Sequence, residues 1–379
     1  MTNFEPGEVR LMRRAIELSL RGEGRVEPNP RVGAVVVSRD GEIVGEGYHE
    51  RFGASHAEVE ALERAGAAAE DATLYVTLEP CTHQGKTPPC TRRILESGIR
   101  RVVVASRDPN PAASGGVDGL RSGGLQVDTG LLAEEAAKAN ARFLWWHATG
   151  EPFLALKLAV SLDGRIAERP GARIALSGPE ANHEVMRLRA AADAVLIGSG
   201  TARSDDPLLT VRSRPAPERV SARVVLDSRA SLSATSKLVL SVDQAPLILF
   251  TAEDAVPSQV ARLEAAGVVV ERVGEAAVDG AGPGRPGLDL NAVFARLVDR
   301  GFRSVLCEGG AVMADSLIAS GRVQRLHWHL APRVMGPGGV PALTNPDIGE
   351  WVLASSRPAG NDVLIEWNHA RLAAVLKGA

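Results

Sequence analysis

The sequence predicts an α/β protein made of two domains. Its 379 residues exceed the roughly 250–300 at which a single hydrophobic core stops growing. Short apolar runs typical of buried strands alternate with helical periodicity along both halves of the chain. Residues 149–152, Thr-Gly-Glu-Pro, interrupt both patterns. We therefore expect a first domain over residues 1–148 and a second over residues 149–379.

The first domain is expected to have the element order α-β-β-α-β-α-β, which predicts a three-layer α/β sandwich. Apolar residues recur at helical spacing over residues 8–21. The apolar run 32–37 predicts a buried strand, and 43–48 its hairpin partner across the turn signal Arg39-Asp40-Gly41. Further predictions are helices at 56–65, 91–97 and 131–143, strands at 74–78 and 102–105, and a loop at 107–124.

The second domain repeats the alternation, so we expect a second α/β unit with a mostly parallel sheet. A helix is predicted over residues 179–192. The stretch 274–287 is rich in Gly and Pro and is expected to be a surface loop. Strands are predicted at 153–160, 194–197, 223–226, 247–250, 268–270, 304–307 and 326–330.

Composition is that of an ordinary soluble globular protein, with 45% hydrophobic and 23% charged residues. A net charge of −3 gives no bulk indication of a nucleic-acid or anionic-membrane partner. The acidic N-terminus does not resemble a signal peptide, and no run of 18 apolar residues predicts a membrane span. Three cysteines make a disulfide framework unexpected. We expect a cytoplasmic homo-oligomer without nucleic-acid or membrane partners.

Three short motifs predict a catalytic zinc site of the nucleoside-deaminase type. They are His56-Ala57-Glu58, Pro80-Cys81 and Cys90. Zinc prefers thiolate and imidazole ligands, and three protein ligands leave a position for a reactive water. We expect His56, Cys81 and Cys90 to bind the metal, with Cys90 stabilised as a thiolate at a helix N-terminus. Glu58 would carry a proton from the water to the leaving amine.

Other interpretations of these residues remain open at this point. Ser55 as N-cap with Glu58 three residues later matches a capping box. The two cysteines could be buried thiols, and His83 could be a fourth ligand that makes the site structural. Zinc deaminases carry H-x-E followed by P-C-x-x-C, whereas eight residues separate the cysteines here. This insertion contains His83 and Lys86, which suit a polar, phosphorylated substrate.

Together with further motifs, these residues resemble the bifunctional riboflavin-biosynthesis deaminase/reductases over nearly the whole chain. The matching motifs are Asn29-Pro30-x-Val32-Gly33, His56-Ala57-Glu58, Cys81-Thr-His-Gln-Gly-Lys-Thr-Pro-Pro-Cys90, Lys157-Leu-Ala-x-Ser161-Leu-Asp-Gly-Arg165, Gly198-Ser-Gly-Thr201, Asp205-Asp206-Pro207-x-Leu209-Thr210-Val211-Arg212 and Glu308-Gly309-Gly310. The resemblance implies a cytidine-deaminase-like domain that deaminates 2,5-diamino-6-(5-phosphoribosylamino)pyrimidin-4(3H)-one. It also implies a dihydrofolate-reductase-like domain that uses NADPH to reduce the ribosyl group to ribityl.

The resemblance also implies roles for individual residues. The deaminase substrate would be contacted by Asn29, His49, His83 and Lys86. NADPH would be contacted by Ala159, Ala175, Thr201, Asp205, Ser228, Gly310, Ala311, Val312 and Met313. The reductase substrate would be contacted by Lys157, Arg173, Arg189, Leu209, Arg212 and Glu308. Without the resemblance, Arg189 and Arg212 would be interpreted as surface charges and His49 as a structural histidine. For Lys86, a phosphate contact is expected, with a surface lysine as the alternative.

The reductase half carries weaker signals of its own. It lacks G-x-G-x-x-G, the common dinucleotide-binding motif. Gly309-Gly310 between a strand and a helix suits phosphate binding, but the same turn is also a common packing device. The family commonly has Trp where this chain has Ala175, which would loosen the wall beside the cofactor unless only the backbone matters there.

Three hypotheses follow from the sequence. The first is the bifunctional enzyme, and the second is a deaminase whose reductase-like half is inactive or repurposed. The third is a non-catalytic, zinc-stabilised nucleotide-binding protein, for which a carboxylate such as Glu58 beside an open metal position would have no use.

Overall fold

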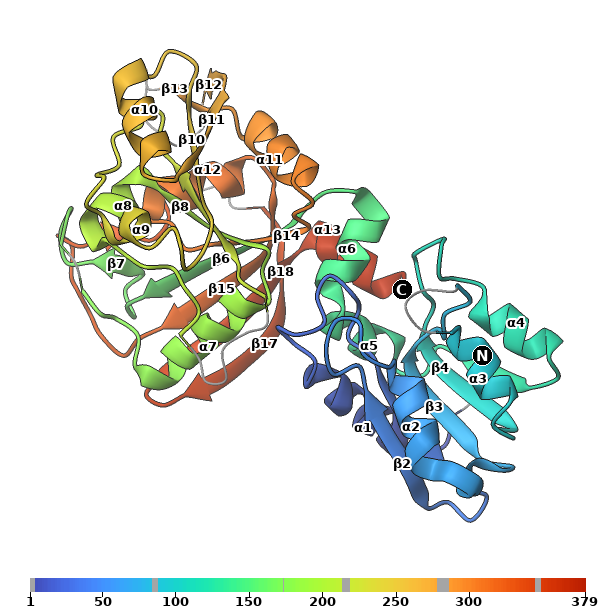
Figure 1. Cartoon of the computed structure of the whole chain (residues 1–379). Helices are drawn as coiled ribbons and strands as arrows, with labels where there is room; N and C mark the ends of the chain where they lie inside the picture. Colours follow the sequence, from blue (N-terminus) through green and yellow to red (C-terminus); the bar gives the residue numbers. More distant parts are fainter. Residues whose placement is uncertain (1–3, 84–87, 173, 213–218, 278–285, 345–348) are drawn as a thin grey trace. The chain divides into compact units, whose positions relative to one another are not determined.

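The computed structural model describes residues 4–83, 88–172, 174–212, 219–277, 286–344 and 349–379. The chain divides into two compact units (Figure 1). The first comprises Met1–Gly150 with Ala374–Ala379, and the second Glu151–Ala373. Within the described residues, no helix combines the length and apolar character needed to cross a membrane.

The first unit is built on a five-stranded sheet with the strand order β2-β1-β3-β4-β5. Strand β1 is antiparallel to both β2 and β3, which confirms the predicted hairpin, whereas β3, β4 and β5 are parallel. The strands are β1 (Gly33–Val37), β2 (Ile43–Tyr48), β3 (Thr73–Leu78), β4 (Arg101–Ser106) and β5 (Gln126–Thr129). The helices are α1 (Pro6–Leu20), α2 (Ala57–Ala65), η1 (Gly66–Ala69), α3 (Cys90–Leu95), α4 (Gly116–Ser122), α5 (Ala133–Ala139) and α6 (Ala141–Thr149).

Helices cover both faces of this sheet, so the predicted three-layer sandwich is confirmed. Strand β1 is buried along its whole length, and its successive side chains enter opposite cores because strand side chains alternate. Val36 packs in the cluster that contains Leu62 of α2. Val35 packs in the cluster that contains Met12 of α1. A fully apolar strand is therefore what a central strand with two covered faces requires.

Two predictions for the first unit are wrong in part. The loop expected at residues 107–124 contains helix α4, which starts where Gly116 packs so closely that a Cβ would lie 1.9 Å from the Pro80 carbonyl oxygen. The single helix expected at 131–143 is two helices that break at Asn140. The Asn140 side chain accepts a hydrogen bond from the Arg31 amide (2.7 Å) and donates one to the Arg31 carbonyl (2.8 Å).

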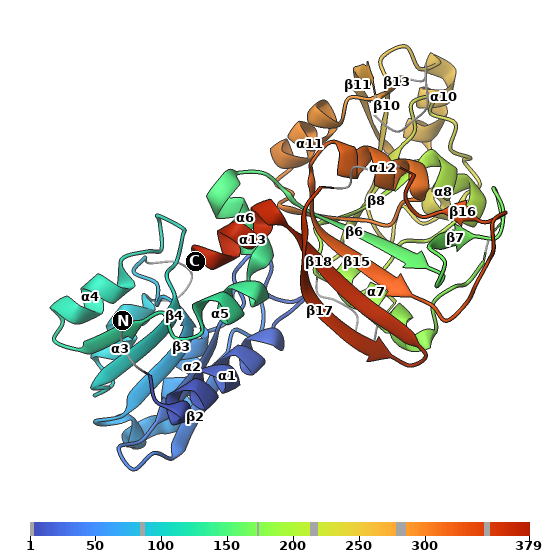
Figure 2. The ribbon, with the colours of Figure 1, turned by 180° about the vertical axis from the view of Figure 1, so that it is seen from behind.

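The second unit contains a nine-stranded sheet in the order β11-β10-β9-β8-β14-β6-β15-β18-β17. All neighbours from β11 to β15 are parallel, and only β18 and β17 are antiparallel, which confirms the mostly parallel prediction. Strand β17 lies at one edge (Figure 2). The strands are β6 (Phe153–Val160), β8 (Ala194–Gly198), β9 (Ala222–Leu226), β10 (Leu247–Ala252), β11 (Val269–Val273), β14 (Ser304–Cys307), β15 (Val323–Leu330), β17 (Trp351–Ala359) and β18 (Asp362–His369).

Smaller elements complete the second unit. The surface loop expected at 274–287 begins and ends in a short hairpin of β12 (Glu275–Ala277) and β13 (Pro286–Leu288), so that prediction is wrong at both ends. Strands β7 (Arg165–Ala167) and β16 (Val340–Pro341) form a second small pair. The helices are α7 (Pro179–Ala190), α8 (Ser199–Asp205), α9 (Lys237–Leu240), α10 (Pro257–Ala265), α11 (Leu290–Asp299), α12 (Ala311–Ala319) and α13 (Ala370–Lys377).

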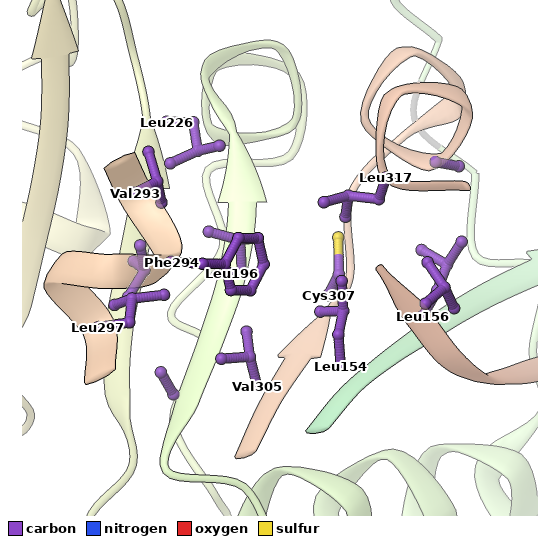
Figure 3. Packing of buried hydrophobic residues seen from close by; sticks show 14 of the residues in the cluster. Leu154, Leu156, Leu196, Leu226, Val293, Phe294, Leu297, Val305, Cys307 and Leu317 are labelled. Atoms are coloured by element: carbon purple, nitrogen blue, oxygen red, sulfur yellow. The ribbon is translucent and has the colours of Figure 1, made fainter. Parts of the chain in front are cut away.

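The core of the second unit lies on both faces of its sheet. Figure 3 shows Leu196 and Val305 of the strands packed towards Phe294 of α11, with Leu317 of α12 beside Cys307. The opposite face holds a second cluster that contains residues of β8, β9 and β10 together with residues of α8, α9 and α10. Because β6, β8, β9 and β14 are parallel, their carboxyl ends meet at one edge, which is where ligands bind in open α/β sheets.

Candidate active sites

His56, Cys81 and Cys90 meet in the first unit, with their ligand atoms all within 4.8 Å of one another. His56 Nδ1 lies 3.2 Å from Cys90 Sγ and 3.6 Å from Cys81 Sγ. These separations suit three corners of a tetrahedron around zinc, given metal–ligand distances of about 2.0–2.3 Å. His83 is exposed and does not belong to the group within the described chain. The donor set is therefore that of a catalytic site with three protein ligands.

Each ligand is positioned by the end of a secondary-structure element. His56 is the N-cap of α2, Cys81 follows β3, and Cys90 is the first residue of α3. The predicted capping box is wrong: His56, not Ser55, occupies the N-cap, and no side chain caps the helix. Because α2 has no capping box, the Glu58 side chain is available for another role.

Glu58 provides an independent test of whether a metal-bound water fits here. It is the second residue of α2 and only 3% exposed, and its Oε2 atom has no hydrogen-bond partner among the described residues. Burial raises the pKa of this carboxyl group. A buried acceptor without a partner is costly, and a water molecule on the metal would supply the missing hydrogen bond. The residues present therefore fit a zinc ion with its water.

The two cysteines and His56 also act on one another electrostatically. Hydrogen bonding to Cys90, together with His56, lowers the pKa of the Cys81 thiol. In turn, the Cys81 sulfur raises the pKa of His56. The Cys90 backbone N–H lies 3.5 Å from Cys81 Sγ and points its hydrogen at the sulfur. Hydrogen bonding to Cys81, together with burial, raises the pKa of the Cys90 thiol. In the absence of a metal ion the pair thus favours a thiolate at Cys81 and not at Cys90, where it was expected; the thiolate is the form that binds a metal.

His49 and Asn29 lie beside the metal ligands. The His49 ring meets the His56 ring edge-on at 5.3 Å between centroids. Its Nδ1 lies 3.0 Å from the Ser55 carbonyl oxygen and its Nε2 lies 3.4 Å from the Asn29 side-chain nitrogen. Donation from Nδ1 to that carbonyl would leave Nε2 as an acceptor. Burial lowers the pKa of His49, so the neutral ring is favoured.

Glu79, which was not predicted to belong to the site, ties a second segment to the predicted zinc ligands. Glu79 is 3% exposed, and its carboxylate accepts hydrogen bonds from the backbone N–H groups of Asp108 (3.1 Å) and Val117 (2.8 Å). Between these two residues, Ala113 packs against Cys81 and Cys90. The only sequence signal was a carboxylate directly before Pro80-Cys81. Lys86, predicted to contact the substrate, lies outside the described residues.

In the second unit, Arg189 of α7 and Glu308 after β14 form a two-pronged ion pair. The Nε–Oε1 and Nη2–Oε2 distances are 2.6 and 2.9 Å. Their side chains are only 8% and 12% exposed. The interpretation of Arg189 as a surface charge is therefore wrong, whereas Arg212 is exposed. Burial lowers the pKa of Lys157 on β6, an effect that the charge of Glu308 opposes.

The turn Gly309-Gly310 combines packing with an accessible backbone. A Cβ on Gly309 would lie 2.7 Å from the Met313 Cβ, so this glycine is required for packing. At Gly310 the nearest neighbour would be Thr201 Oγ1 at 3.6 Å, and the Gly310 amide donates to that oxygen (3.1 Å). Helix α12 follows with exposed Val312 in its first turn. Thr201 and Gly310 are thus adjacent, as a shared cofactor contact would require.

The other residues expected in the reductase pocket are less closely grouped. Leu209 is buried in the core cluster on one sheet face, and Asp205 ends α8. Ala159 is half-buried on β6 and Ser228 is half-buried just after β9. Ala175 is exposed, and Arg173 lies outside the described residues.

Comparison with known proteins assigns both units. The family of cytidine and deoxycytidylate deaminase zinc-binding regions matches residues 7–106. The RibD C-terminal domain family matches residues 152–365, which is more than half of the chain. These matches confirm the expected cytidine-deaminase-like and dihydrofolate-reductase-like folds.

Individual relatives cover both units together. The riboflavin biosynthesis protein RibD of Bacillus amyloliquefaciens is 39% identical over 333 residues, which covers 88% of this chain and 86% of the relative. The structure of Acinetobacter baumannii RibD superposes with a TM-score of 0.80 at 31% identity, over 96% of this chain and 98% of that one. A diaminohydroxyphosphoribosylaminopyrimidine deaminase/5-amino-6-(5-phosphoribosylamino)uracil reductase of Thermotoga maritima gives 0.78 at 34% identity, over 96% and 99%.

A zinc-deaminase region and a RibD C-terminal domain thus occur in one chain, in the same order and over nearly the same length as in these relatives. The residues that could hold zinc lie in the first region, and a buried ion pair next to a glycine turn lies in the second. The chain therefore belongs to the RibD family of bifunctional riboflavin-biosynthesis enzymes, which pair a zinc-dependent deaminase with an NADPH-dependent reductase.

Proposed function

We propose that the chain catalyses two consecutive steps on one phosphorylated pyrimidine. The first is hydrolytic deamination of 2,5-diamino-6-(5-phosphoribosylamino)pyrimidin-4(3H)-one, and the second is reduction of its ribosyl group to ribityl. The observation that carries the first step is the unpartnered, buried Glu58 oxygen next to His56, Cys81 and Cys90. The third hypothesis, a non-catalytic zinc site, does not account for that carboxylate.

In the deaminase, His56, Cys81 and Cys90 would hold zinc, which when bound acidifies a water molecule. Glu58 would accept a proton from that water and transfer it to the amine that leaves. Its raised pKa suits this role, because a carboxylate with a higher pKa accepts the proton of the water more readily, and a pKa nearer to neutral still allows the proton to be returned. Asn29 and neutral His49 would orient the pyrimidine through hydrogen bonds, and His83 and Lys86 would contact its polar or phosphorylated end.

In the reductase, NADPH supplies hydride when bound. Thr201, Asp205, Ser228 and the turn that starts α12 (Gly310, Ala311, Val312, Met313) would contact the cofactor, with Ala159 and Ala175 along its edge. Lys157, Arg189, Leu209, Arg212 and Glu308 would contact the substrate, with Arg173. The support for this division is positional: Gly310 and Thr201 are hydrogen-bonded to one another, and Arg189 and Glu308 are paired close to Lys157.

Four further proposals, on domain division, oligomeric state, localisation and partners, rest on the sequence and its composition. We place the functional division of the chain at residue 149, and expect a homo-oligomer in the cytoplasm without nucleic-acid partners. The net charge of −3 and three cysteines support the last two of these expectations.

One incubation tests both reactions. The protein is given the diaminopyrimidinone phosphate with and without NADPH, and the products are identified by mass. Without NADPH, we expect only the exchange of an amino group for oxygen. With NADPH, the product should gain two further hydrogens. An unchanged substrate in both reactions would contradict the proposal, and deamination alone would leave the deaminase with an inactive reductase-like unit.

A further inference from the structure

The segment 205–212 of the second unit carries three of the proposed contacts: Asp205, Leu209 and Arg212. Its backbone is unusual, because Asp206 (φ 42°) and Leu209 (φ 57°) adopt the left-handed conformation without being glycine. Such residues persist only where the surroundings hold them in place. Something outside the segment must therefore define its shape.

Three elements hold the segment at alternate residues. The Lys237 amide at the start of α9 donates to Asp206 Oδ1 (2.8 Å). Arg223 of β9 donates from Nη1 to the Leu208 carbonyl (3.3 Å). Arg189 donates from Nη1 to the Thr210 carbonyl (3.0 Å). The backbone is thus fixed on both sides of Leu209, whose side chain is 3% exposed.

Arg223 is an unexpected residue for its position. It is completely buried at the second position of β9, and its hydrogen-bond partners in the described chain are neutral. Besides Leu208, the guanidinium donates to the Ser241 hydroxyl (2.7 Å), the Ser241 carbonyl (2.9 Å) and the Ala245 carbonyl. Burial lowers its pKa to about 10, with Asp243 acting in the opposite direction. A buried cation without a bonded carboxylate is costly, whereas an apolar side chain would pack at this site without that cost.

We propose that Arg223 is a positioning residue of the reductase, which fixes the Leu208 carbonyl and thereby places Leu209 and Arg212 at the substrate. This inference rests on the proposed function of the second unit. The guanidinium reaches the segment and the Ser241–Ala245 turn at once because its donors form a planar fork. Lysine has no such fork and can serve only part of this set. Arg223 is not among the residues proposed to contact substrate or cofactor, and it bonds to the backbone of the segment that carries Leu209 and Arg212, so we expect its effect in substrate binding more than in hydride transfer.

The test compares Arg223→Met and Arg223→Lys in the full chain with Gln324→Met as a matched control. Gln324 is also buried in the second unit, and its Oε1 accepts a hydrogen bond from the Leu154 amide (2.6 Å). It lies near the start of β15, next to β6, and it hydrogen-bonds to β6 rather than to segment 205–212. Its loss should destabilise the unit without moving segment 205–212.

For Arg223→Met, we expect the KM for the deaminated pyrimidine to rise about tenfold, while kcat changes less than about twofold. Arg223→Lys should give a smaller rise in KM. Gln324→Met should lower the melting temperature and leave KM unchanged. A KM for Arg223→Met or Arg223→Lys equal to that of the wild type would overturn the proposal.

Hydrogen exchange provides a readout that does not depend on activity. In both Arg223 variants, the amides of residues 208–212 should exchange faster than in the wild type, whereas Gln324→Met should leave them unchanged. Unaltered exchange in the Arg223 variants would also overturn the proposal. By contrast, a wild-type protein that fails to oxidise NADPH with the deaminated pyrimidine would contradict the proposed function, and the exchange result would still decide the role of Arg223.

Discussion

The two candidate sites differ in how their residues are distributed along the chain. The ligands of the zinc site lie within 35 residues, from His56 to Cys90, and each follows or starts an element. The reductase pocket joins Arg189 to Glu308, which are 119 residues apart. When a site is formed by one short stretch of the chain, the residue types and their spacing predict its chemistry. When a site is assembled from residues on several strands and helices, those residues come together only in the fold. Their chemistry can then be interpreted only after the strand order is known.

The substitution Glu58→Gln should have the largest effect, and it should affect only the deaminase site. The amide keeps the size of the carboxylate but cannot accept the proton, so deamination should fall by about a thousandfold. Metal content should remain that of the wild type, and NADPH oxidation with the deaminated pyrimidine should not change. Zinc analysis and the two rates check this. Full deaminase turnover with zinc still bound would show that Glu58 has no proton-transfer role.

The distributed site should respond differently to the loss of one partner. Arg189→Met would leave the Glu308 carboxylate buried without its cation, which we expect to lower the free energy of unfolding of the second unit by about 3 kcal/mol. Reductase kcat/KM should fall about a hundredfold, because both the proposed substrate contact and the Thr210 hydrogen bond are lost.

Denaturant unfolding and steady-state rates measure these effects, with deaminase activity as the internal control. Arg189→Met with Glu308→Gln should recover part of the stability without recovering the reductase. A normal rate in the single variant would mean that the pair is structural only.

Ala175 offers a smaller test, which would sharpen the description of the cofactor wall. Replacement by Trp should lower the KM for NADPH about threefold if a ring at this exposed position packs against the cofactor. Phenylalanine at the same position is the matched control, since it offers a smaller apolar face. No change in either variant would indicate that only the backbone of residue 175 matters.

The smallest expected effect concerns Asp108 next to the zinc site. Burial raises its pKa from 3.8 to about 6, so the folded state retains its proton to a higher pH than the unfolded state. The unfolded chain therefore binds fewer protons between about pH 4 and pH 6, and stability falls as pH rises through that range. The cost persists above pH 6.

Asp108→Asn removes this cost and keeps the oxygen that accepts from the Asn110 amide. The variant should be more stable than the wild type by about 1 kcal/mol at pH 8, after allowance for solvent screening, and equally stable near pH 4. Thermal unfolding at the two pH values measures the difference. An advantage at pH 4 that disappears at pH 8 would reverse the sign of this assignment.

Much of the fold was predictable because its strands are continuous apolar runs between clear turn signals. Strands β17 and β18 were not predicted. In β17 the apolar run Trp351–Leu353 is followed by mostly polar, exposed residues, so the strand shows neither a continuous apolar run nor the alternation of a half-buried strand. The break at Asn140 was missed because helical periodicity continues through it, and only the distant partner Arg31 reveals the interruption.

The sites follow the same rule. The zinc ligands and Glu58 were named from the sequence, although the cap of α2 was assigned one residue too early. Glu79 was not found, because its partners are backbone amides at 108 and 117 that carry no residue-type signal. Arg223 was missed for a similar reason, since a strand arginine bonded only to oxygens far along the chain resembles any surface charge in sequence.

The break between α5 and α6 restricts which residue types can occupy position 140. A carboxamide offers both a donor group and an acceptor group, as a strand neighbour does, and each is used on one of the two backbone groups of Arg31. Aspartate would lack the donor, and glutamine would hold the same groups one methylene too far away. Arg31 lies two positions after Asn29. The junction of α5 and α6, remote in sequence, therefore helps to fix the backbone next to Asn29, which is proposed to contact the deaminase substrate. Substitutions of Asn140 would therefore be selected against because of their effect on the candidate deaminase site in the same unit.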